Sequence, residues 1–130
     1  MTDAGEALRA AAVAALAAVE GIGRVYDAPP LSAAAPHALV EIDSEADWGH
    51  KSGVGRELRL AAKLTGAGER PLAMRASATA AEAALAALDA DLDGWRLVTM
   101  RHLRTRELRR AKGGWTAVIE FSARLLAYGP

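Results

Sequence analysis

Apolar residues recur at helical spacing in two stretches of this chain. They predict amphipathic helices over residues 3–20 and 70–89. Asp3, followed by Glu6, is typical of a helix start, and Gly21 and Gly23 are expected to end that helix. Pro71 suits the first position of the second helix. The apolar stripes are Leu8, Ala12, Ala15, Leu16 and Val19, and then Met74, Ala78, Ala81, Leu85 and Leu88.

Four other stretches alternate between apolar and polar residues, at 37–43, 56–65, 95–105 and 115–126, and this alternation predicts strands. Val25 and Tyr26 are candidates for a further short edge strand. The predicted fold is α+β, with one antiparallel sheet of about four strands, made of two hairpins, and two helices on one face. The element order is α-β-β-α-β-β, in a single domain spanning residues 1–130.

The composition predicts a thin core and no strong overall charge. Hydrophobic residues make up 52% of the chain, but much of this is alanine, and only three Trp, two Tyr and one Phe are present. We therefore expect partner subunits to supply part of the burial. Sixteen basic and sixteen acidic residues balance, yet residues 1–65 hold six Lys/Arg and nine Asp/Glu, a net of −3. With no cysteine, signal peptide or membrane-spanning stretch, we expect a soluble protein made in the cytoplasm.

Four carboxylates alternate along the first predicted hairpin, at Glu41, Asp43, Glu45 and Asp47. On a regular strand all four would point the same way, which would suit a hard cation or paired acids in an enzyme. The alternative, a solvated or interface face, is favoured because nothing else in the sequence completes a calcium loop. The three histidines lack metal spacing, so no metal or other cofactor is expected.

The second predicted hairpin is strongly basic. Seven Lys/Arg between residues 96 and 112 against Glu107 leave about +6, which we expect on a protrusion. The cationic residues of interest are Arg101, Arg104, Arg106, Arg109, Arg110 and Lys112. Three interpretations stay open: contact with nucleic acid, a solvated hairpin, or contact with the acidic row of a neighbouring copy.

A polar, glycine-containing segment from Ser44 to Gly55 is expected to be a flexible connection that holds Trp48 and Lys51. Trp48 either is half-buried locally or anchors a partner protein.

The order of these motifs resembles the tail-terminator, or tail-completion, proteins of long-tailed phages and gene transfer agents. The resemblance rests on the Ala/Leu-rich first helix, the segment 23–30 (GRVYDAPP), Pro36 before a strand, and Asp47-Trp48 followed by Lys51 and Gly53. The segment 56–66 (RELRLAAKLTG) and Gly113-Gly114-Trp115 before the last strand also fit.

This resemblance implies a structural protein without enzymatic activity, which forms a hexameric ring. The ring would cap the tail tube, end its polymerisation and join it to the head connector, with DNA passing through the lumen. The implied partners are other copies of the chain, the major tail tube protein, the head–tail connector (stopper) protein and double-stranded DNA in transit, but no membrane. It also implies assembly in the bacterial cytoplasm and a final place in the neck or tail of a particle. A nucleic-acid-binding module using residues 101–112 and a cation-dependent enzyme using residues 41–47 remain the alternatives.

Overall fold

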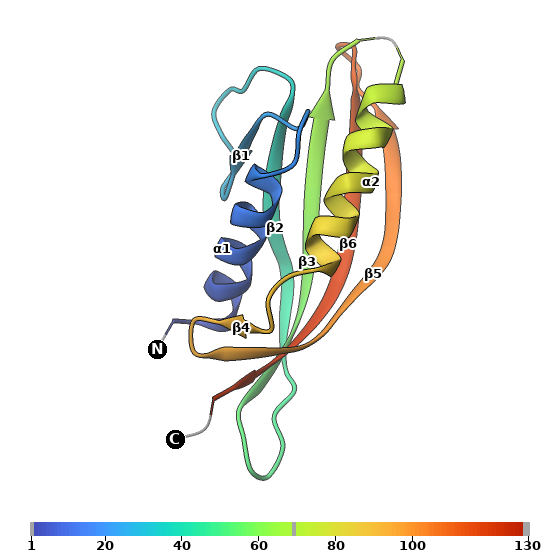
Figure 1. Cartoon of the computed structure of the whole chain (residues 1–130). Coiled ribbons are helices and arrows are strands. Elements are labelled where there is room, and N and C mark those ends of the chain that lie inside the picture. Colours follow the sequence, from blue (N-terminus) through green and yellow to red (C-terminus); the bar gives the residue numbers. More distant parts are fainter. Residues whose placement is uncertain (1, 69, 129–130) are drawn as a thin grey trace.

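The computed structural model describes residues 2–68 and 70–128. Two helices lie on the same face of one curled sheet of six strands (Figure 1). The elements in chain order are α1 (Ala4–Ala17), β1 (Arg24–Tyr26), β2 (His37–Asp47), β3 (Gly55–Gly66), α2 (Leu72–Ala86), β4 (Asp91–Leu92), β5 (Trp95–Arg109) and β6 (Trp115–Ala127).

Both helices were predicted, with bounds a few residues too wide. Asp3 is the N-cap of α1, and its side chain accepts hydrogen bonds from the amides of Gly5 (2.7 Å) and Glu6 (3.2 Å). The C-cap is Ala18, so α1 ends before the predicted glycines. Pro71 is the N-cap of α2 and not its first helical residue.

The sheet corrects the predicted strand number and order. Its strands are arranged β1-β2-β3-β6-β5-β4, with β1 and β4 added to the four predicted strands. All neighbours are antiparallel except β1 and β2, so the sheet is mixed. The candidate edge strand at Val25 and Tyr26 is confirmed as β1, although the predicted architecture did not count it. The two residues of β4 are too few for alternation to reveal.

The segment 23–30 forms β1 and the start of a loop that carries the chain back to begin β2 beside it. Arg24 is paired with His37, and Tyr26 with Leu39. Gly23 allows this close approach, because its φ is +70° and a Cβ there would lie 2.0 Å from the carbonyl oxygen of Pro36. The parallel edge of the sheet therefore depends on this glycine.

Three register shifts interrupt the sheet. One lies in β2 between Ile42 and Ser44, and two lie in β5, between Leu97 and Thr99 and between His102 and Arg104. A bulge moves the following side chains to the other face. Strand alternation read from the sequence therefore fails beyond the shift in β2 and between the two shifts in β5, since the second of these restores the original alternation.

The core lies between the helices and the central strands β3 and β6. Phe121 is the largest fully buried side chain of the described residues. Alanines fill much of the remaining core, on the helices as well as on the strands. The core-facing residues of the two central strands are Leu58, Leu60, Ala62, Leu64, Ala117, Ile119, Phe121, Ala123 and Leu125, all 2% exposed or less.

We predict that Gly23→Ala destabilises the subunit more than Gly68→Ala. Both glycines have positive φ, which costs an L-residue about 1–2 kcal/mol, but a Cβ at Gly68 would meet nothing within 4 Å. Only Gly23→Ala adds the clash with Pro36, so it should also displace β1. Urea denaturation of the two variants measures the difference, and equal losses of stability would contradict this account of the β1–β2 edge.

Candidate interface surfaces

The face of the sheet opposite the helices is covered by no other element among the described residues. We call this surface the helix-free face. The strand register places its side chains in rows across β2, β3, β6 and β5. From one end of the sheet to the other the rows are Ala46, Glu57, Arg124 and Thr99; Ser44, Arg59, Ser122 and Arg101; Glu41, Ala61, Glu120 and Arg104; Leu39, Lys63, Val118 and Arg106; and His37, Thr65, Thr116 and Leu108.

Ion pairs connect neighbouring strands on the helix-free face. Lys63 Nζ lies 2.6 Å from Glu41 Oε1, and Arg124 Nε lies 2.8 Å from Glu57 Oε2. The Glu120 carboxylate accepts a hydrogen bond from Arg104 and has Arg106 Nε at 3.9 Å. Six basic and three acidic residues occupy these rows, so the face has a net charge of +3.

The pKa of Glu120 is lowered, chiefly by the hydrogen bond from Arg104. Partial desolvation opposes this shift, while the charges of Arg104, Arg106 and Arg59 add to it. The pKa of Glu107 is also lowered, and the largest cause is the hydrogen bond that Glu107 accepts from Arg75 on α2. Both glutamates are thus held ionised by arginines of the same subunit.

The four carboxylates predicted to share one face of a strand do not do so. Glu41 lies on the helix-free face, Asp43 occupies the bulge, and Glu45 comes after the register shift. Glu45 Oε1 would be 3.1 Å from a Cβ at Gly5 in α1, so Glu45 lies on the helix side. The bulge therefore removes the geometric basis for a row of cation ligands.

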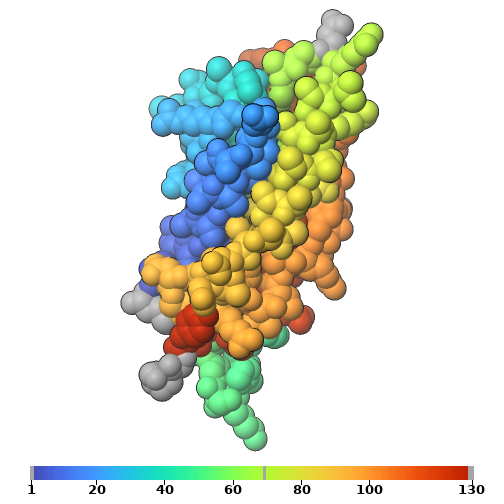
Figure 2. All heavy atoms as spheres, viewed as in Figure 1, coloured from blue at the N-terminus to red at the C-terminus, as the bar shows by residue number. Residues whose placement is uncertain are grey.

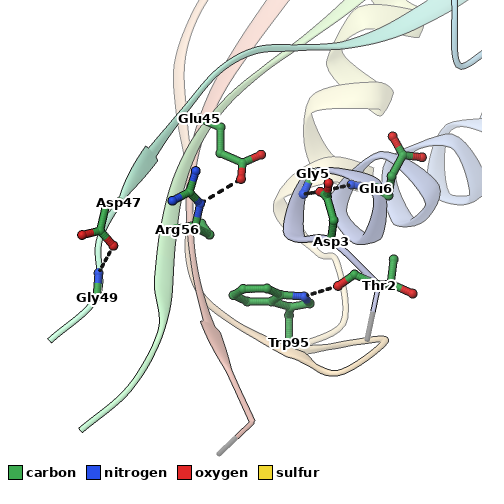
Figure 3. A network of polar contacts seen from close by, with 9 residues as sticks. All are labelled: Thr2, Asp3, Gly5, Glu6, Glu45, Asp47, Gly49, Arg56 and Trp95. Atoms are coloured by element: carbon green, nitrogen blue, oxygen red, sulfur yellow. Dashed lines mark hydrogen bonds and ion pairs between the residues drawn. The ribbon is translucent and has the colours of Figure 1, made fainter. Parts of the chain in front are cut away.

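Figure 3 shows that Glu45 and Asp47 each contact a nearby residue of the same subunit. Glu45 Oε2 lies 2.8 Å from Arg56 Nε on β3, and Asp47 accepts a hydrogen bond of 3.0 Å from the amide of Gly49. In the same view the Trp95 indole donates to the carbonyl of Thr2 (2.7 Å), which ties β5 to the N-terminal segment. These contacts are structural ones within the subunit.

The basic hairpin is part of the sheet and not a protrusion. Because β6 pairs with β3 as far as Trp115 and Gly66, only the turn at residues 110–114 extends beyond the paired strands. The six cationic residues are divided between surfaces. Arg101, Arg104 and Arg106 lie on the helix-free face, Arg109 has its guanidinium 5.8 Å from the Trp115 ring, and Arg110 and Lys112 lie in the turn.

The tip of the β2–β3 hairpin projects beyond the sheet (Figures 1 and 2). Ser44–Asp47 belong to β2, so the connection is shorter than predicted and comprises residues 48–54. Trp48 is half-buried, with the guanidinium of Arg124 5.2 Å from its ring, while Lys51 is exposed in the turn. Trp48 therefore rests on its own subunit and still offers indole surface at the tip.

The sequence did not identify Arg59, Glu120 and Arg124 as site residues. They were placed on the outer side of predicted strands, but their partners depend on a register between β3, β5 and β6 that alternation does not fix. Arg59 and Arg124 line a depression of about 280 Å³ on the helix-free face. The other residues that line it are Glu57, Thr99, Arg101 and Ser122.

No group of three or more His, Asp or Glu side chains in residues 2–68 and 70–128 is arranged to hold a metal ion. Within the same residues, no helix is long and apolar enough to cross a membrane.

The fold is thus a two-helix α+β unit whose charged side chains form surface ion pairs and an open basic face. A family model described as tail completion protein gp17 matches residues 6–126, and the chain belongs to this family. It is also similar to a chain from the virion of a native gene transfer agent particle. The identity is 27% and the TM-score 0.82, covering 97% of this chain and 100% of that one. No curated protein matches the chain.

These comparisons confirm the resemblance found in the sequence. Together they identify a structural protein of a phage or gene transfer agent tail, a component of a virion.

We predict that Arg104→Gln raises the pKa of Glu120 more than Arg106→Gln does, because Arg104 supplies the hydrogen bond and Arg106 only a charge. Because the pKa of Glu120 is lowered in the folded state, its carboxylate stabilises the fold at pH values above the ordinary pKa of 4.5. This contribution is lost as the pH falls through the folded pKa. Carboxyl NMR titration measures both shifts. Equal shifts would show that the hydrogen bond is not the dominant cause.

Proposed function

We propose that this chain forms a ring of identical subunits, six by the family resemblance, at the end of a tail tube. The ring caps the completed tube, ends its polymerisation and joins it to the head connector, and double-stranded DNA passes through its lumen. The partners are then other copies of the chain, the tube protein and the connector (stopper) protein. Subunits are made in the bacterial cytoplasm and end in the neck of the particle.

The observation that carries this proposal is the similarity, along nearly the whole length of both chains, to a chain of a gene transfer agent virion. The core agrees with it, because its many alanines bury little surface each, and a ring would bury more.

We also propose that the function is structural and not catalytic. The alternative of a cation-dependent enzyme relied on the acidic row, which the bulge at Asp43 divides between two faces. The alternative of a stand-alone nucleic-acid module retains one supporting observation, the net charge of +3 on the helix-free face. Steep salt dependence of duplex-DNA binding by the free subunit would favour that alternative.

We predict a ring in the particle. Electron microscopy of tails and native mass spectrometry of released tail ends should give six copies per particle at one end of the tube. Loss of the gene should leave tubes that are not joined to heads. A single copy per particle would refute the ring, whereas a monomeric free subunit would not, since the tube end can act as a template.

We predict that Trp48→Ala reduces tail completion and changes subunit stability little. Trp48 is half-buried, and its exposed contact with Arg124 is worth about 0.5–1 kcal/mol. The matched control is Trp95→Ala, because Trp95 is 4% exposed and donates to Thr2. Removing a buried tryptophan costs about 3–5 kcal/mol.

Thermal melts of the free subunits and counts of completed particles measure the two effects. A large loss of stability for Trp48→Ala together with normal assembly would show that Trp48 serves only the fold of its own hairpin.

A further inference from the structure

The sheet has two open edges on opposite sides of the subunit. On one side, β1 pairs with β2 only at residues 37–39, so residues 40–47 of β2 form an edge. On the other side, β4 pairs only with Trp95 and Arg96, so residues 98–109 of β5 form the second edge. Among the described residues, neither stretch makes a backbone hydrogen bond to a strand on its outer side.

The directions of the outward backbone groups follow from the hydrogen bonds at the two hairpin ends. The amide of Arg110 donates to Gly114 across the β5–β6 turn, so by alternation the amides of Thr105, Glu107 and Arg109 point to the open edge. The amide of Trp48 donates to Gly55, so those of Glu45 and Asp47 point outward from β2. Each edge thus presents donors to a partner strand.

The two edges carry opposite charge. Residues 40–47 hold four carboxylates and no basic residue, a charge of −4. Residues 98–109 hold four arginines and Glu107, a charge of +3. Within the described residues, Asp43 and Arg101 have no ion-pair partner in their own subunit. Pairing two like edges would oppose like charges, whereas pairing β2 with β5 brings opposite charges together.

The strand directions also permit this pairing. In the order β2-β3-β6-β5 every neighbour is antiparallel, so β5 runs opposite to β2. When two copies stand side by side in the same orientation, β5 of one copy meets β2 of the next copy as an antiparallel strand. A head-to-tail contact of this kind closes into a ring when its rotation allows.

We infer that subunits join by strand addition: the β5 edge of one copy pairs with the β2 edge of the next copy, and the sheet continues from subunit to subunit. This inference rests on the proposed ring and specifies its interface. The bulges at Asp43 and Leu103 limit the regular part of the contact, which on β5 is residues 104–109. The helix-free faces then form one continuous surface around the ring.

The test is Thr105→Pro against the matched control Thr105→Val. Thr105 is exposed, and its amide points away from β6, so proline leaves the β5–β6 ladder intact while removing the outward donor. Valine keeps that donor, the β-branched shape and the strand preference, and both variants lose the hydroxyl contact with His102. We expect particles with completed tails to fall at least tenfold with proline and to stay within about twofold of wild type with valine.

Hydrogen exchange of the wild-type chain gives a second measurement that depends on no variant. The amides of Thr105, Glu107, Glu45 and Asp47 should exchange fast in the free subunit and become protected in assembled particles. Equal completion by the two variants, or fast exchange of these amides in rings that do form, would overturn strand addition and leave the ring standing. A single copy per particle would overturn both proposals.

Discussion

The pairing of β3 with β6 along nearly their whole length is the interaction on which the rest of the structure depends. Twelve residues of each strand are in register, from Gly55–Leu126 to Gly66–Trp115. One face of this pair is apolar and buried by α1 and α2, and the other is lined by ions. Since Leu60 and Phe121 are adjacent beneath the helices, register and core packing specify each other.

The alanine-rich composition fits the packing of the two helices on the β3–β6 pair. Alanines make up much of the contact between the helices and the central strands, and each of them buries little apolar area. A subunit with such a core is stabilised further by an assembly whose contacts add burial and backbone pairing. The open edges of β2 and β5 and the exposed hairpin tip are the places where such contacts can form.

The electrostatics of the subunit are organised locally. The sequence has an acidic first half and a basic second half, but the sheet brings the two halves side by side, so Glu57 of the first half meets Arg124 of the second. After this pairing within the subunit, three charged surfaces remain: the negative edge at β2, the positive edge at β5 and the basic helix-free face. Opposite edges on one subunit suit head-to-tail assembly, which identical patches would not.

The sequence alone determined both helices, the four long strands and the family, because helical stripes, alternation and motif order are local patterns. It indicated β1 only as a candidate edge strand at Val25 and Tyr26. It did not determine β4, which is too short to alternate, or the strand order, which depends on contacts between distant segments. The candidate site shows the same division. The sequence identified Trp48 and the basic residues as candidates from their local segments. The bulges at Asp43 and Leu103 decided which face of the sheet each strand side chain occupies. A bulge adds one residue to a strand, and only pairing with the neighbouring strand reveals it.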